Sequence, residues 1–268
     1  MSKVAWATDI HLDWATPQQR DRFYASFGAT GADAALISGD IGEGKNTAHW
    51  LREMAGVFRQ PIYFVLGNHD FYGGSIPQVR RDIRQLAASG PGLVYLPAAG
   101  VVELGPETGL IGHDGWGDAR LGDYEGSQVF LSDFVTIKEL AAVNHDRALL
   151  HARLRSLGDE AAAHVARVLP EALARYRQVV FLTHVPPFRE AAWHEGQYSA
   201  DDWLPYFSCR AVGETLLEIM RQHPARQLLV LCGHTHGSGE SQIRENLRVL
   251  TGGADDRGPR FHQTLQLD

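Results

Sequence analysis

Short apolar runs alternate with amphipathic segments through the first 90 residues, and this alternation limits the fold more than any other feature of the chain. Residues 4–8, 34–37 and 62–66 are predicted strands, because each is a brief apolar run bounded by polar or turn residues. The segments between them place apolar side chains at helical spacing. This β–α–β–α–β order predicts a largely parallel sheet with helices packed on it.

A polar motif follows each of these strands, and two further motifs follow apolar runs at 179–182 and 228–231. In open parallel sheets, functional residues gather at the carboxyl ends of the strands. We therefore expect the five motifs to meet at one site. In chain order they are Asp9-Ile10-His11, Gly39-Asp40, Gly67-Asn68-His69-Asp70, Thr183-His184 and Gly233-His234-Thr235-His236.

The residue types in these motifs suit a site for two cations. Two divalent cations about 3.5–4 Å apart can hold the attacking and leaving oxygens of a displacement reaction. Asp40 is the natural bridge, because its carboxylate has two oxygens for two metals. Asn68 offers a neutral amide oxygen, and His184 adds an imidazole.

The first and last motifs each place two candidate ligands two residues apart. Alternate residues of an extended strand share a face, so we expect Asp9 and His11 to point to one side, and His234 and His236 likewise. Each motif alone is more typical of an ordinary turn or surface strand. Their joint order at strand ends favours a dinuclear site.

Together the motifs resemble those of the calcineurin-like metallophosphoesterases, a superfamily of dinuclear phosphate-ester hydrolases. The resemblance implies that His69 does not bind metal. His69 would instead donate a proton to the leaving group or stabilise a phosphoryl oxygen, while a metal-bridging hydroxide attacks. It also implies that one metal is held by Asp9, His11, Asp40 and His236, and the other by Asp40, Asn68, His184 and His234.

One position departs from the family pattern. Many members carry a second aspartate three residues after the bridging one, where this chain has Glu43. The job of orienting His69 is thereby left open between Glu43, Asp70 and the backbone.

The resemblance further implies an α/β fold, a four-layer α/β/β/α sandwich of two mixed sheets. We expect a single metallophosphoesterase domain over residues 1–268, with a helical insertion at about 117–177 that borders the site. The composition of residues 132–177 predicts two or three helices, broken near Gly158 and Pro170. Residues 186–206 predict a long aromatic loop, which either binds substrate or packs on its own scaffold.

The Gly-rich segment after the predicted strand at 110–112 has two interpretations. His113 either lines the substrate pocket or belongs to a structural turn. Asp114, Asp118 and Asp123 form either a third cation site or a solvated acidic loop.

Composition and charge limit the classes of binding partner and the location that we expect for this chain. The net charge of −7 and the lack of clustered Lys and Arg argue against a broad nucleic-acid surface. No apolar run is long enough to span a bilayer, and the start shows no signal-peptide pattern. Two cysteines make no disulfide framework, so we expect a cytoplasmic protein. The oligomeric state stays open.

The sequence thus predicts hydrolysis of a phosphodiester or phosphomonoester of modest size. Oxygen and nitrogen ligands without cysteine suit Mn, Fe, Zn or Ni as divalent or trivalent ions alike. Three alternatives remain beside this prediction: a nuclease of the same superfamily, a protein phosphatase and a catalytically silent binding scaffold.

Overall fold

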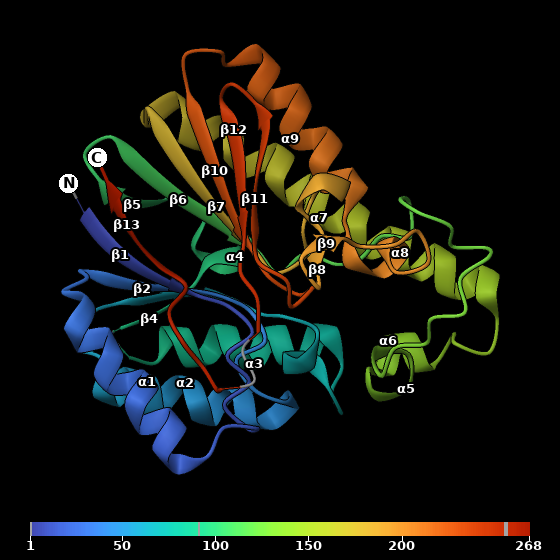
Figure 1. Ribbon diagram of the computed structural model, residues 1–268, viewed down its shortest axis with the longest axis horizontal. Helices are drawn as coiled ribbons and strands as arrows, with labels where there is room; N and C mark the ends of the chain where they lie inside the picture. The colour runs from blue at the N-terminus through green and yellow to red at the C-terminus, as the bar shows by residue number, and fades with distance from the viewer. Residues whose placement is uncertain (1, 91, 255–256) are drawn as a thin grey trace.

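The computed structural model describes residues 2–90, 92–254 and 257–268. Its strands form a five-stranded and a six-stranded sheet that pack face to face, and helices cover the outer face of each sheet (Figure 1). This arrangement confirms the four-layer α/β/β/α sandwich of two mixed sheets. Among the described residues, no helix is both long enough and apolar enough to cross a bilayer.

The first sheet contains the three predicted amino-terminal strands. Its strands are, in spatial order, β13 (Gln263–Leu267), β1 (Ser2–Ala7), β2 (Ala34–Ser38), β3 (Ile62–Val65) and β4 (Leu93–Tyr95). β1 to β4 run parallel, and β13 pairs antiparallel with β1. The connecting helices α1 (Pro17–Thr30), α2 (Thr47–Val57) and α3 (Ile76–Ala88) cover its outer face (Figure 1).

The second sheet is parallel in its centre and antiparallel at both edges. Its strands are, in spatial order, β11 (Gly239–Arg244), β12 (Leu247–Thr251), β10 (Gln227–Cys232), β7 (Gln178–Thr183), β6 (Thr108–His113) and β5 (Val102–Gly105). The helices α7 (Arg147–Arg175) and α9 (Arg210–Gln222) cover its outer face. The short helix α4 (Leu96–Ala99) follows β4 directly.

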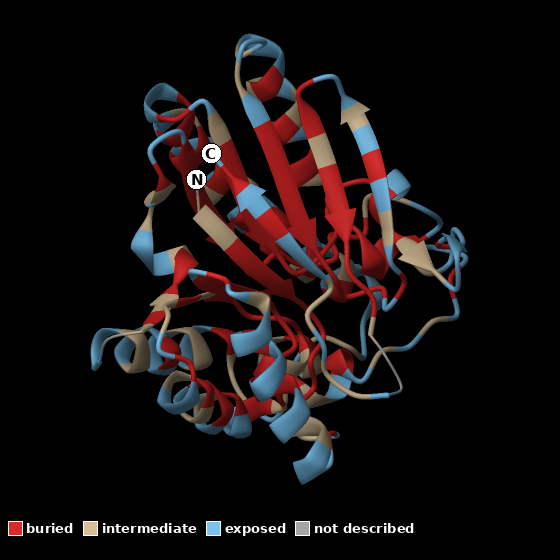
Figure 2. Ribbon diagram, turned by 60° about the vertical axis from the view of Figure 1, so that its left-hand side comes forward, coloured by how far each residue is buried: buried red, intermediate tan, exposed pale blue. Residues whose placement is uncertain are grey.

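The inner faces of both sheets form a buried apolar layer. Trp6 and Leu36 from the first sheet belong to the same core cluster as Leu182 and Leu231 from the second. Figure 2 shows that the strands in the middle of both sheets are buried along most of their length. Because such strands are covered on both faces, they read as continuous apolar runs in the sequence.

The region of the expected insertion contains α5 (Asp133–Thr136), α6 (Lys138–Ala141) and the 29-residue helix α7. The expected breaks near Gly158 and Pro170 are wrong, since α7 runs through both residues. A proline inside a helix costs about 3 kcal/mol. Around Pro170, α7 buries Val168, Leu169 and Leu173 against the second sheet, and this burial outweighs the cost.

Residues 186–206 are not the structureless loop that the sequence predicts. They contain a hairpin of β8 (Trp193–His194) and β9 (Gln197–Tyr198), followed by α8 (Leu204–Phe207). The hairpin turn consists of Glu195 and Gly196, which both adopt positive φ. Asn-Gly and Asp-Gly are the usual residues of such a turn, so the sequence Glu195-Gly196 does not predict it.

Candidate metal centre

The five motifs meet where the carboxyl ends of β1, β2, β3, β7 and β10 converge. Backbone hydrogen bonds hold the loops to one another across both sheets. Asp9 N–H donates to the Gly39 carbonyl at 3.1 Å, and Gly233 N–H donates to the His184 carbonyl at 2.9 Å. The His234 N–H donates to the Asp9 carboxylate at 3.1 Å.

Four of the candidate ligands form one compact group. One ligand atom from each of Asp9, His11, Asp40 and His236 lies within 4.8 Å of the others. His11 Nε2 is 3.7 Å from Asp40 Oδ2, and His236 Nε2 is 3.6 Å from Asp9 Oδ1. The spacing leaves these atoms close enough to share one cation.

A second group of candidate ligands lies around the side chain of Asn68. Its Oδ1 lies 3.2 Å from His184 Nε2 and 3.0 Å from His234 Nδ1. Asp40 Oδ2 lies 3.4 Å from His184 Nε2, so the same oxygen faces both groups. The two Asp40 oxygens are therefore not divided between the groups as expected, because Oδ1 accepts the His69 N–H at 2.9 Å.

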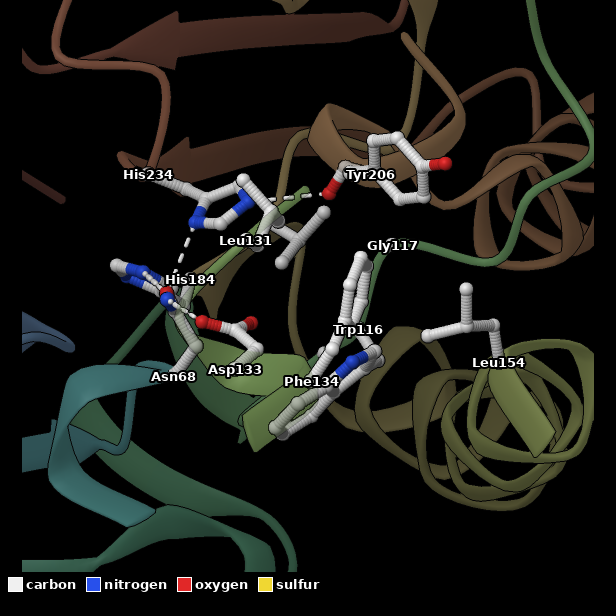
Figure 3. Close-up of a pocket in the computed structure, with 12 residues that line it drawn as sticks. Asn68, Trp116, Gly117, Leu131, Asp133, Phe134, Leu154, His184, Tyr206 and His234 are labelled. Carbon is white, nitrogen blue, oxygen red and sulfur yellow. Dashed lines mark hydrogen bonds between the residues drawn. The ribbon is translucent and has the colours of Figure 1, made fainter. Parts of the chain in front are cut away.

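The histidine rings are oriented as they are in metal-binding sites. His184 Nδ1–H donates to the Ser38 carbonyl at 2.9 Å, and His234 Nε2–H donates to the Tyr206 carbonyl at 3.1 Å (Figure 3 shows the second bond). A metal-ligating histidine donates its outer ring N–H to such an acceptor, which fixes the tautomer. In these orientations the inner nitrogens, His184 Nε2 and His234 Nδ1, face the centre.

His11 provides a further test of whether the residues fit a cation. It is buried, and neither ring nitrogen has a hydrogen-bond partner. Buried polar side-chain atoms are nearly always bonded, so an orphaned imidazole requires an explanation. A cation held beside Asp9 and Asp40 would supply the missing partner for His11.

The backbone at the candidate ligands is strained. Among the described residues, seven non-glycine residues have positive φ, and five of them are Asp9, His11, Asp40, His234 and His236. The expected extended conformation is therefore wrong, since φ is 50° at Asp9 and 39° at His11. Such conformations are uncommon for residues with a Cβ, and they concentrate at functional sites.

Two glycines in the motifs make room for carboxylates. A Cβ on Gly67 would lie 2.2 Å from Asp40 Oδ1, and one on Gly233 would lie 2.1 Å from Asp9 Oδ2. Any larger residue would displace a candidate ligand. The glycines before Asn68 and His234 are therefore part of the site, although they contribute no side chain.

Burial and charge set the protonation of the centre. Burial alone would raise the pKa of Asp40, but the neighbouring His184 and His69 hold it well below its usual range. Burial lowers the pKa of His11 to about 4, and burial together with His184 lowers the pKa of His234 to about 3. Burial would lower the pKa of His184, but the Asp40 carboxylate raises it to about 10, so a cation at His184 would replace a proton. The Asp40 anion beside neutral His11 and His234 is a suitable donor set for cations.

His69 lies at the edge of the centre. Its ring packs edge-on against His11 and against Trp14, at centroid distances of 4.8 and 5.3 Å. His69 Nδ1 is 3.6 Å from Glu43 Oε1, and Nε2 is 3.5 Å from the Tyr72 hydroxyl. Glu43 is therefore the carboxylate beside His69.

Asp70 has a different position and partners. Its buried carboxylate accepts the N–H groups of Ile41, Gly42 and Gly67, and the Thr47 hydroxyl donates to it at 2.8 Å. Asp70 thus ties the Asp40 loop to the Asn68 loop rather than orienting His69.

Asp133 was not identified from the sequence. It lies at the start of α5, and its Oδ1 accepts Asn68 Nδ2–H at 2.9 Å and the Tyr72 hydroxyl at 2.8 Å (Figure 3 shows the bond to Asn68). The carboxylate is buried. Its bond to the amide nitrogen directs Asn68 Oδ1 toward His184 and His234.

His113 and Asp114 lie apart from the centre. His113 Nδ1 accepts the Gly115 N–H at 3.1 Å, and its ring packs against the half-buried His164. Asp114 Oδ2 accepts Arg80 Nε–H at 2.9 Å and the Tyr95 hydroxyl at 2.7 Å. These contacts favour the structural interpretation of both residues.

The other two acidic residues of that region are also engaged. Asp118 pairs with Arg120 at 2.9 Å, and Asp123 accepts the Gly126 N–H at 2.9 Å. In the described part of the chain, the one cluster of acidic and histidine side chains with metal-ligand spacing is the Asp9 group. The third cation site therefore has no support.

Two open cavities flank the centre. One, of about 290 Å³, is lined by Asp9, His11, Trp14 and His236 among others, and Trp14 stacks on His11 at a centroid distance of 4.0 Å. The other, of about 350 Å³, is lined by polar residues of the centre and by aromatic residues of 130–134 and 194–207. A substrate can thus approach the centre from solvent.

Comparison with solved structures shows the same fold. A dimetal phosphatase from Danio rerio is 15% identical, with 94% of this chain and 87% of that chain covered and a TM-score of 0.59. A phosphopantetheinyl hydrolase from Mycobacterium tuberculosis is 14% identical, with 94% and 89% covered and a TM-score of 0.64. A search of curated proteins found no match.

The sequence profile of the calcineurin-like phosphoesterases matches residues 2–238, nearly the whole chain. That span contains all five motifs and every strand of the candidate centre. The chain therefore belongs to the calcineurin-like phosphoesterase family and is a metal-dependent hydrolase of phosphoric esters.

Proposed function

We propose that this protein hydrolyses a small phosphodiester or phosphomonoester at a centre of two cations. The observation that carries the proposal is the set of histidine rings whose inner nitrogens face two carboxylates and one amide oxygen. The first cation would be held by Asp9, His11, Asp40 and His236, and the second by Asp40, Asn68, His184 and His234.

When bound, the cations would polarise the phosphoryl group and activate water for attack at neutral pH. His69 would act from the edge of the centre as proton donor to the leaving oxygen, or as hydrogen-bond donor to a phosphoryl oxygen. Glu43 supports this role by its position, since its Oε1 lies 3.6 Å from Nδ1, on the side of the ring where a carboxylate can orient it.

The donor set agrees with Mn²⁺, Fe, Zn²⁺ or Ni²⁺, because it contains oxygen and nitrogen ligands without thiolate. The dimetal phosphatase among the structural neighbours supports a reaction at two cations rather than one. The intact ligand set and the presence of His69 favour catalysis over a silent binding scaffold.

The experiment compares hydrolysis of bis-p-nitrophenyl phosphate and p-nitrophenyl phosphate after reconstitution with Mn²⁺. We expect turnover that requires metal and falls by about 10²–10⁴-fold in His69→Ala. His49→Ala is the matched control, because His49 is exposed on α2. Metal-bound protein that hydrolyses neither ester would contradict the proposal.

A further inference from the structure

The cavity of about 350 Å³ beside His69 and His234, here called the aromatic groove, has two apolar walls. One wall is Phe130 and Leu131, which precede α5. The other is Trp203 and Phe207, which border and belong to α8. Phe130 and Leu131 lie in the expected insertion at about 117–177, and Trp203 lies in the expected aromatic loop at 186–206, which Phe207 follows directly. The groove therefore brings both regions to the proposed centre.

The α8 wall is a continuous row of rings that leads to a candidate ligand. Phe207 packs edge-on against His234 at a centroid distance of 5.2 Å, and Trp203 packs against Phe207 at 5.0 Å. His194 continues the row at 6.1 Å from Trp203, and its Nδ1–H donates to the Thr235 carbonyl at 2.9 Å. This row is thus anchored at both ends before any ligand binds.

The opposite wall leaves apolar surface uncovered. Phe130 is 64% exposed, and its ring packs edge-on against the buried Phe134 at 5.5 Å. Phe130 and Trp203 line the same cavity, so a planar group bound there would gain apolar contact with either ring. The groove is accordingly suited to a flat apolar group.

The charge of the groove limits the ligand further. Among the described residues that line either cavity beside the centre, none is lysine or arginine. Recognition of a second phosphate or a carboxylate normally uses such cations. The part of the substrate outside the reacting phosphate is therefore expected to carry no negative charge.

We infer that the aromatic groove binds the alcohol portion of the ester, and that this portion is an uncharged aromatic or flat apolar group. The inference rests on the proposed function, because it places the reacting phosphate at the two-cation centre. It favours aryl-type esters over nucleoside polyphosphates, whose further phosphates would find no basic side chain in the groove.

The test uses binding rather than turnover. Calorimetry on the Mn²⁺-reconstituted protein compares phenylphosphonate with methylphosphonate, which share the phosphoryl group and differ in the ring. We expect phenylphosphonate to bind about tenfold tighter, because stacking of a flat ring on an aromatic side chain typically strengthens binding by about that factor or more. Phe130→Ala and Trp203→Ala should each lower this preference about threefold or more without weakening methylphosphonate.

Two control variants remove exposed side chains from the same regions but outside the groove. Tyr198→Ala tests the hairpin region, and Val135→Ala tests α5; these side chains are 53% and 56% exposed. Both should keep the wild-type preference. Equal affinity for the two phosphonates, or a preference unchanged in Phe130→Ala and Trp203→Ala, overturns the groove inference alone. Failure of both phosphonates to bind in the presence of metal overturns the proposed function, and the groove inference with it.

Discussion

Asp133→Ala is the substitution that best tests how the centre is supported. The wild-type carboxylate is buried and accepts hydrogen bonds from Asn68 at 2.9 Å and Tyr72 at 2.8 Å. Removal of the carboxylate leaves the Asn68 amide free to rotate, so that Oδ1 no longer faces His184 and His234. The change removes no proposed ligand, so its effect on cation binding must pass through Asn68.

The expected size of the effect follows from these two bonds. A hydrogen bond to a charged group contributes about 1.5–3 kcal/mol, and about 1.4 kcal/mol corresponds to tenfold in affinity. Substitutions of residues that orient metal ligands typically cost about 10–100-fold in metal affinity. We therefore expect Asp133→Ala to weaken the cation at Asn68 about 10–100-fold, with a much smaller effect on the cation at His11.

The assay is a stepwise Mn²⁺ titration monitored by calorimetry, which resolves a tighter and a weaker binding step for the two cations. Asp133→Asn should retain part of the affinity, because its amide oxygen can still accept the Asn68 N–H. Asp118→Ala is the control, since Asp118 is equally buried but bonded to Arg120 and to the Ala211 N–H. A folded Asp133→Ala protein that binds both cations like wild type would refute the reasoning.

Three further substitutions test other parts of the account. Asp40→Ala should abolish tight binding of both cations in equilibrium dialysis, because one carboxylate faces both groups; retention of both would exclude it as the bridge. Asp70→Ala leaves several buried N–H groups without an acceptor, so it should lower the free energy of unfolding, measured in urea, by about 2–4 kcal/mol. An unchanged urea midpoint would show that those groups find other acceptors. Burial lowers the pKa of His113 from 6.5 to about 3. Between these values the unfolded chain binds a proton that the folded protein does not, so wild type loses stability as pH falls. When the pH is lowered from about 7.5 to about 5, the free energy of unfolding of the wild-type protein should fall by about 2 kcal/mol more than that of His113→Gln. Parallel stability curves would contradict this, and His49→Gln, at an exposed histidine, serves as control.

The sequence predicted the strands that carry the first three motifs, because residues 4–8, 34–37 and 62–66 are buried on both faces and read as apolar runs. It did not predict the turns after them. Asp9 and His11 adopt left-handed conformations, which Asp and His tolerate better than most residues but still adopt rarely, so the local sequence does not predict them. Contacts across both sheets hold them there, including the bond from His234 N–H to Asp9.

Long-range contacts also explain the other differences. Asp133 reaches Asn68 from 65 residues away, and no spacing in the sequence marks that contact. Pro170 is a helix-breaking signal, yet α7 continues through it because the second sheet buries the surrounding apolar residues. The second sheet as a whole was expected from the family resemblance, although the apolar runs at 110–112, 179–182 and 228–231 indicated three of its strands. Its β11 edge strand is mostly polar and gave no apolar pattern.

Anomalous diffraction from a crystal grown with Mn²⁺ tests the central claim most directly. We expect two peaks, both beside Asp40, one among Asp9, His11 and His236 and the other among Asn68, His184 and His234. A single peak, or a pair of peaks away from Asp40, would contradict the two-cation centre on which the proposed hydrolysis depends.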